Sequence, residues 1–217
     1  MKRRTFISLM SVMAAAGVLS LAGCSSNTSA STASSTAASA SAAAANKLET
    51  IQSNGKLVIA LEGAWQPWSF HDESDTLVGY DVEVSRAIAE KLGVEPEFVE
   101  INWDTKETEL AAKSIDCIWN GLTLTDDREE NMACTKPYVK NAQVVVVKDG
   151  TDYTSTADLI GKTVVAEAGS AGETTITENA DLSQADFISK AVQTDCLMEV
   201  AAGTADAAIL DLTLASA

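Results

Sequence analysis

The sequence has few of the residues that build metal sites and nucleic-acid surfaces. It contains a single histidine, His71, and four cysteines of which no pair has metal-ligand spacing, which argues against a zinc site. We therefore expect neither a metal nor a cofactor. Basic residues are also scarce, with 15 Lys and Arg against 31 Asp and Glu and a net charge of −16. A surface that acidic argues against nucleic acid and anionic lipid as partners.

Long apolar runs are missing everywhere except at the N-terminus. Residues 2–4 are basic, and residues 5–19 are mostly apolar. This stretch is too short to span a membrane and has the form of a secretory signal. The small residues that lead to Cys24 resemble the lipobox of bacterial lipoproteins, in which the cysteine becomes the acylated first residue after cleavage. We predict a signal peptide over residues 1–23, lipidation of Cys24 and attachment to the outer face of the cell membrane.

Residues 24–46 are almost entirely Ser, Ala and Thr. Such a segment has nothing to bury, so it is predicted to be a flexible tether. The folded part is then residues 47–217, with 12 Lys and Arg against 31 Asp and Glu and a net charge of −19. Its length suits one sizeable core or two small lobes.

The stretch from Ile115 to Glu129 is the most informative part of the chain. It reads as a short strand that ends at Asn120-Gly121, followed by alternating threonines and a helix capped by Thr125 or Asp126. Arg128 lies in the first turn of that helix, where a cation is unfavourable for the helix dipole, so a partner explains it better. A planar fork of donors beside Thr hydroxyls suits a carboxylate. The alternative is an ordinary strand-to-helix junction with a surface arginine.

Strand patterns alternate with helix patterns, which predicts an α/β fold. The strands are expected over residues 57–61, 97–101, 115–120, 141–148, 162–167, 186–188 and 205–210. The run Val144–Val147 is typical of a strand buried on both faces. Ser170 and Glu173 form a capping box at a helix start, which is also a ready anion site. Asp211 stands at the carboxyl end of the last strand, where ligands bind in open α/β sheets.

A loop rich in aromatic residues precedes the first long helix. We expect Trp65, on the loop before Pro67, to be exposed to a cleft. One apolar face marks the helix that follows, ended by Gly93, and it consists of Tyr80, Val84, Ala87, Ile88 and Leu92.

Several motifs together carry a resemblance to a known family. They are Pro67-Trp68-Ser69-Phe70-His71-Asp72, Gly79-Tyr80-Asp81-Val82-Glu83, Trp103-Asp104, Asn120-Gly121-Leu122-Thr123-Leu124-Thr125, Arg128, Pro137-Tyr138, Gly161-Lys162-Thr163-Val164 and Ala205-Asp206-Ala207. In this order they resemble the extracellular solute-binding proteins of family 3, the polar amino-acid-binding proteins of ABC importers. The resemblance covers residues 47–217.

The resemblance implies a two-lobed fold of the type II periplasmic binding proteins, which closes on its ligand. We place lobe 1 at residues 47–143 and lobe 2 at residues 144–217. The implied ligand is a free amino acid, and the implied partners are the permease subunits of an ABC transporter, with the binding protein itself a monomer.

The resemblance also implies roles for individual residues. Arg128 would hold the α-carboxylate of the ligand, with contacts from Gly121 and Thr123. Trp65 and Trp103 would sandwich the ligand side chain. Ser170 would complete the carboxylate site, and Asp211 would bind the α-ammonium group. A zwitterion needs both a cationic and an anionic receptor when the cleft dries, which agrees with these roles.

Two glutamates point to the ligand class. Glu62 and Glu167 would make the side-chain pocket anionic, which favours a cationic amino acid or one such as cystine. The alternative is that both glutamates face water.

Three further expectations concern alternatives and the ends of the chain. An enzyme resembling periplasmic dehydratases, with His71, Glu62 or Glu167 as acid or base, is one competing function. A ligand-sensing subunit for a membrane receptor is another. The chain ends six residues after Asp211, where the family continues through a return strand and a helix, so we expect a fragment or a truncated reading frame that binds weakly.

Cysteine pairing is the last expectation. Cys117 and Cys134 flank the threonine loop and its helix, and we predict a disulfide between them, with Cys196 as the free thiol. Two buried thiols are the alternative.

Overall fold

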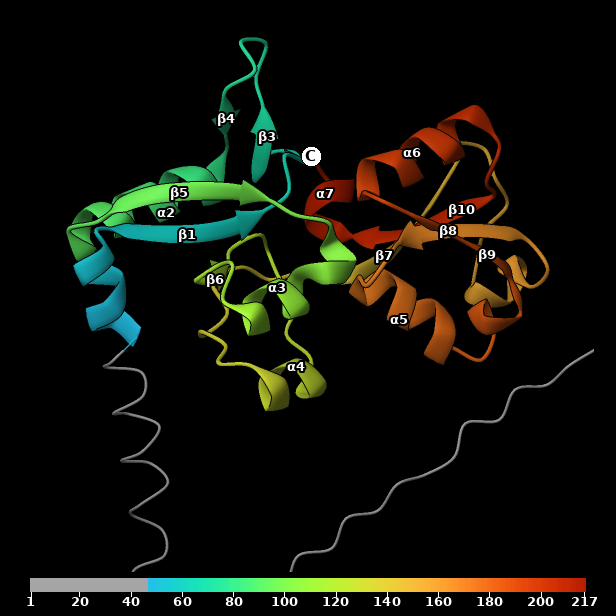
Figure 1. The fold of residues 1–217 in the computed structure, drawn as a ribbon. Helices are drawn as coiled ribbons and strands as arrows, with labels where there is room; N and C mark the ends of the chain where they lie inside the picture. Colours follow the sequence, from blue (N-terminus) through green and yellow to red (C-terminus); the bar gives the residue numbers. More distant parts are fainter. Residues whose placement is uncertain (1–46) are drawn as a thin grey trace, which may run out of the picture. The chain divides into compact units, whose positions relative to one another are not determined.

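The computed structural model describes residues 47–217, which form two larger sheets and a small three-stranded one (Figure 1). The predicted signal peptide, Cys24 and the Ser/Ala/Thr-rich tether lie outside the described residues. Within residues 47–217, no helix has the length and apolar character needed to cross a membrane.

The first sheet is parallel, with strand order β5-β1-β6. β1 (Lys56–Leu61) is central between β5 (Glu95–Glu100) and β6 (Cys117–Ile118), and its apolar residues are buried except for the partly buried Val58. Because the strands are parallel, Glu62, Trp103 and Gly121 follow carboxyl ends at the same edge of the sheet. The short helices η1 (Trp103–Thr105), α3 (Lys106–Ala112) and α4 (Asp126–Asn131) continue from this edge.

A small antiparallel sheet is inserted after β1. It consists of β2 (Ala64–Trp65), β3 (Ser69–His71) and β4 (Leu77–Val78), and it leads into α2 (Tyr80–Leu92). Gly93 ends α2 with a φ of 74°, and its N–H bonds back to the helix carbonyls. This is the left-handed cap that the sequence predicts.

The second large sheet is mixed, with strand order β7-β10-β8-β9. Its strands are β7 (Gln143–Val147), β8 (Thr163–Glu167), β9 (Asp186–Lys190) and β10 (Ala207–Asp211). β10 is parallel to β8 and antiparallel to β7. The short helices η2 (Thr156–Leu159), η3 (Leu182–Gln184) and α7 (Leu212–Ala215) complete this part of the chain.

Strand alternation divides the core of this sheet into two clusters. Val164, Ala166 and Ile209 pack with Ile176 of α5 (Ala171–Glu178). Val165, Ala208 and Leu210 pack with Cys196 and Val200 of α6 (Gln193–Ala202). Since side chains along a strand point to alternate faces, α5 and α6 cover opposite faces of the sheet (Figure 1).

The structure corrects two sequence-based expectations about burial. The valine run of β7 is half-buried, because β7 is an edge strand with β10 as its neighbour in the sheet. The buried face of α2 is Asp81, Val82, Ser85 and Ala89, whereas Tyr80 is 50% exposed. The apolar pattern was misleading because the polar residues of the true face find partners inside the protein. The Ser85 hydroxyl donates to the Val82 carbonyl, and one carboxylate oxygen of Asp81 accepts from the Tyr138 hydroxyl at 2.9 Å.

The predicted disulfide is also corrected. Cys117, Cys134 and Cys196 are all free thiols in the described part of the chain. Cys117 packs against the core around Leu57 and Ile59, and Cys134 donates instead to the Arg128 carbonyl. Burial raises the pKa of Cys117 to about 11, so its neutral thiol form is favoured.

The buried carboxyl of Asp81 leads to a prediction about stability. Burial raises its pKa from 3.8 to about 6, which outweighs the hydrogen bonds from Tyr138 and Trp119. The folded state therefore holds the proton more tightly than the unfolded state. This contribution is complete below about pH 4 and is lost as the pH rises through about 6, a change of about 3 kcal/mol in the free energy of unfolding. Asp81→Asn should flatten that part of the pH profile.

Urea unfolding of both proteins between pH 4 and 7 would measure the difference. Other carboxyls titrate in the same range but contribute to both profiles, so subtracting one profile from the other isolates Asp81. Equal pH slopes in the two proteins would contradict the prediction.

Candidate ligand-binding site

One cavity is lined by residues from both large sheets, and it has a volume of about 10 Å³, room for about one water molecule. Its lining consists of Glu62, Trp65, Trp103, Asn120, Gly121, Thr123, Arg128, Glu167, Ala171, Gln193 and Asp211. All the residues predicted from the sequence to contact ligand are among them except Ser170, whose neighbour Ala171 takes that place.

Arg128 reaches the cavity from the first turn of α4. Thr125 caps this helix by accepting the Arg128 N–H at 3.3 Å, which fixes where the side chain starts. The guanidinium is 7% exposed and donates to the Thr123 carbonyl at 2.7 Å and to the Gly169 carbonyl at 3.1 Å. Its Nε lies 3.6 Å from Glu107. A buried cation held mainly by neutral carbonyls can exchange them for a carboxylate.

Lys106 is a second cation beside Arg128, and the sequence analysis missed it. It is buried, and its Nζ donates to the Trp103 carbonyl at 2.9 Å and to the Gly169 carbonyl at 2.8 Å. The Nζ also lies 4.9 Å from the centre of the Trp103 ring. Burial lowers the pKa of Lys106. Lys106 lies at the start of α3, and a cation is unfavourable for the helix dipole there, as it is for Arg128 at the start of α4. This anomaly in the sequence could have singled out Lys106 as well.

Asp211, at the end of β10, is surrounded by donors. Its carboxylate accepts from Gln143 at 2.7 Å and from Thr123 at 3.4 Å, and also from Asn141 and Gln193. The backbone N–H of Asp211 donates to the side-chain oxygen of Gln193 at 3.0 Å, so the amide of Gln193 bonds to both the backbone and the carboxylate of Asp211. The amides of Asn141, Gln143 and Gln193 were not predicted, because their positions in sequence carry no motif.

Trp65 and Gly121 form one wall of the cavity. Trp65 is 4% exposed, so it is not open to a cleft as predicted, but it does line the cavity. Gly121 has a φ of 61°, and a Cβ placed on it would overlap the Trp65 ring. Glycine is therefore required there for both its backbone conformation and its lack of a side chain.

Ser170 has a structural task in addition to any contact with ligand. Its Oγ accepts the Glu173 N–H at 3.2 Å and so caps α5 as predicted. Glu173 does not complete the capping box on Ser170, since its carboxylate accepts instead from the Gly169 N–H at 2.6 Å. Both contacts hold the 168–170 loop whose carbonyl meets Arg128 and Lys106.

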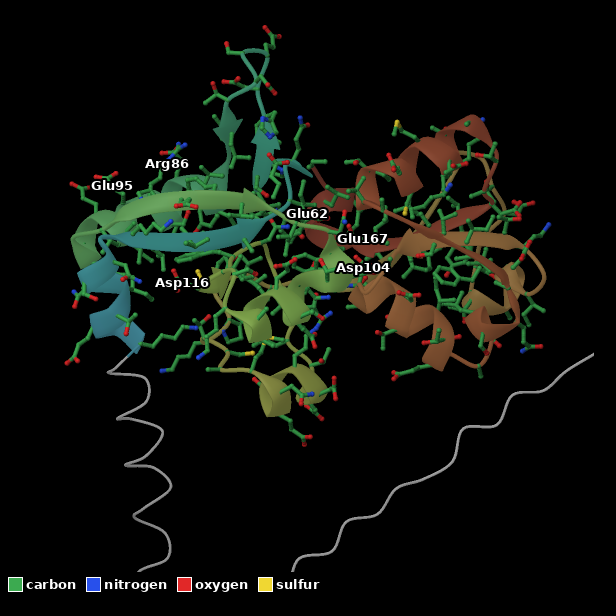
Figure 2. All side chains as sticks on the ribbon, in the orientation of Figure 1. Glu62, Arg86, Glu95, Asp104, Asp116 and Glu167 are labelled. Atoms are coloured by element: carbon green, nitrogen blue, oxygen red, sulfur yellow. The ribbon has the colours of Figure 1, made fainter. Side chains whose placement is uncertain are left out.

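Glu62 and Glu167 also line the cavity, and Figure 2 shows them near the junction of the two large sheets. Glu62 directly follows β1, and Glu167 is the last residue of β8. Both are buried, which contradicts the alternative that they face water. Burial raises the pKa of each carboxyl.

Residues 57–211 match the bacterial extracellular solute-binding proteins, family 3, and the chain belongs to this family. It is 36% identical to the L-cystine-binding protein TcyA of Bacillus subtilis over 115 residues, which cover 52% of this chain and 43% of TcyA. The chain spans about half the length of the curated relatives it matches.

Solved structures agree with this family assignment. A truncated, arginine-bound ArgBP from T. maritima is 33% identical, with a TM-score of 0.72 over 77% of this chain and 79% of that one. The ancestral amino-acid-binding protein AncCDT-1, described as a precursor of cyclohexadienyl dehydratase, is 28% identical, with a TM-score of 0.74 over 78% and 75%. The predicted two-lobed α/β fold class is thereby confirmed, and as a member of an extracellular family the protein functions outside the cytoplasm.

Proposed function

We propose that this protein is the substrate-binding lipoprotein of an amino-acid ABC transporter. It captures a polar amino acid between lobe 1 (residues 47–143) and lobe 2 (residues 144–217) and delivers it to a permease. The observation that carries this proposal is the presence of buried Arg128, on α4, and buried Asp211, at the end of β10 in the second large sheet, in one cavity. Together they match the two charged ends of an amino acid.

The proposed contacts follow from the geometry of the cavity. The guanidinium of Arg128 gives up its hydrogen bond to the Gly169 carbonyl and binds the α-carboxylate of the ligand instead. Gly121 and Thr123 lie on the same cavity and add contacts to that carboxylate. Asp211 binds the α-ammonium group, and Trp65 and Trp103 flank the side chain. Ser170 supports the carboxylate end by holding the α5 cap.

Binding also requires movement. A cavity of about 10 Å³ is smaller than any amino acid, so the two walls must separate for entry and approach again afterwards. Arg128 already connects the two parts of the chain through the Gly169 carbonyl, and Thr123 does so through Asp211. Contacts of this kind couple ligand capture to lobe closure.

The ligand class follows from two further carboxyls of the cavity. Glu62 and Glu167 are buried there, and a cationic or cystine-like side chain would place its positive charge against them. Two similar proteins support a preference for such ligands: TcyA is named an L-cystine-binding protein, and the ArgBP structure is arginine-bound.

The cellular setting is part of the proposal. Lipidation at Cys24 would anchor a monomeric binding protein beside its permease, and the Ser/Ala/Thr-rich tether would let it reach the entrance. A ligand-sensing subunit of a membrane receptor would use the same ligand site. Permease and ATPase genes next to this one would favour import over sensing.

An enzyme on this fold is the second candidate, because AncCDT-1 is described as a dehydratase precursor and the cavity is lined by three buried carboxyls. His71 does not join them: it lies outside the cavity lining and bonds to Glu100 at 2.8 Å. A binding protein uses all the polar groups of the cavity, whereas a dehydratase would use few of them. Conversion of a small carboxylate, followed by NMR over hours, would favour the enzyme.

A thermal-shift panel of amino acids on the full-length protein tests the proposal. A true ligand at about 100 times its Kd should add roughly 2.7 kcal/mol to the free energy of unfolding. We expect arginine, lysine or cystine to give the largest shifts and aspartate to give none. No shift with any amino acid would contradict the proposed function.

A further inference from the structure

The contact between Glu62 and Glu167 is unusual because it joins two acids from different sheets. Both residues line the cavity of about 10 Å³, and a side-chain hydrogen bond joins their carboxyl groups. They are 6% and 1% exposed, so solvent does not separate them. Within residues 47–217, the Oε1 atom of each is buried and accepts no hydrogen bond from a conventional donor.

Two ionised carboxylates can only accept hydrogen bonds, so this contact requires a proton on one of them. Burial disfavours the charged form of both acids. The negative charge of Glu62 also disfavours ionisation of Glu167, whereas the hydrogen bond from Glu167 favours the ionised form of Glu62. The charged groups around the pair are Lys106, which favours ionisation of Glu62, and Asp211, which opposes ionisation of both acids. Arg128 lines the same cavity, Gln193 lies 3.5 Å from Glu167, and Cys196 on α6 keeps its thiol proton.

We propose that Glu62 and Glu167 share one proton, and that the positive side-chain group of the ligand displaces it, so that each cationic amino acid captured releases one proton. This inference rests on the proposed function and adds a mechanism of selection to it. The exchange is balanced. The protonated carboxyl loses H⁺ to a water or buffer base, no covalent bond changes otherwise, and two carboxylates then face one ligand cation.

The exchange explains how the site discriminates among amino acids. A neutral side chain leaves the proton in place, and the acid–carboxylate hydrogen bond then keeps Glu62 and Glu167 together. A cationic side chain replaces that hydrogen bond with two charge-assisted hydrogen bonds, one to the carboxylate of Glu62 and one to the carboxylate of Glu167. An acidic side chain meets a pair that already carries a negative charge and is rejected.

The exchange also determines how affinity depends on pH. The free protein holds the shared proton and the complex does not, so affinity for a cationic amino acid rises with pH. The expected slope is about tenfold per pH unit while the pair stays protonated in the free protein. Coupled acids titrate as a pair, so the measured midpoint belongs to both residues.

Calorimetry on the full-length protein tests the inference with arginine, lysine and glutamine as ligands. Each titration is run at one pH in phosphate and in Tris, because the difference in buffer ionisation enthalpy reports the number of protons released. We expect about one proton per arginine or lysine and about none per glutamine. Glu167→Gln should abolish the release and the pH slope, and Glu62→Gln should do so as a second variant. Glu178→Gln, an exposed acid on α5, is the matched control and should behave as wild type.

The outcomes separate the inference from the proposed function. Binding of arginine or lysine without proton release, or with equal release in Glu167→Gln and Glu62→Gln, would overturn the inference and leave the function standing. Tighter binding of glutamine than of either cation would do the same. Absence of heat with every amino acid would overturn both.

Discussion

Replacing Arg128 with alanine is expected to weaken amino-acid binding by about 2–5 kcal/mol, or roughly 30- to 5,000-fold in Kd. The guanidinium is buried and presents its donors at the place proposed for the ligand carboxylate. Without it, the carboxylate would lose its charged partner on leaving water. Calorimetry with the best ligand of the thermal-shift panel measures the loss.

Two further variants sharpen the interpretation of this experiment. Arg128→Lys keeps the charge but not the planar fork, so its loss of affinity should be intermediate. Arg86→Ala is the matched control, because Arg86 on α2 pairs with Glu83 at 3.0 Å and lies outside the cavity lining (Figure 2). It should bind as wild type does. Unchanged affinity in Arg128→Ala would remove Arg128 from the site.

Gly121→Ala is expected to lower the free energy of unfolding by about 2–5 kcal/mol and to abolish stabilisation by ligand. The left-handed backbone at a φ of 61° costs about 1–2 kcal/mol for any residue with a Cβ. The new methyl group would also overlap the Trp65 ring, and overpacking of this kind typically costs about 1–3 kcal/mol. Displacement of the indole would deform the wall of the cavity. Thermal unfolding with and without ligand measures both effects.

Gly150→Ala separates these two contributions. Gly150 has a φ of 81°, but a Cβ there would meet nothing within 4 Å. The Gly150→Ala variant should therefore lose only the backbone contribution of about 1–2 kcal/mol from its free energy of unfolding, and ligand should still stabilise it. Equal losses in the two variants would show that the contact with Trp65 is unimportant.

The sequence by itself determined the features that depend on neighbouring residues. The helix end at Gly93, the caps at Thr125 and Ser170, and the strands of both large sheets all appear where local patterns predict them. Arg128 could be singled out because a cation in the first turn of a helix is anomalous in its local setting. Asp211 could be singled out because the end of a strand is a recognisable position.

Only the tertiary structure decided which distant residues meet, because no local pattern specifies a partner. It brought Lys106 to the Gly169 carbonyl and Gln193 to Asp211, and it separated Cys117 from Cys134. It also reversed the expected face of α2, since Asp81 is buried through a hydrogen bond from Tyr138, 57 residues further along the chain. Most of all, it placed Glu62 against Glu167. Each acid is unremarkable where it stands in the sequence, and their shared proton arises only because folding removes both from water at the same point.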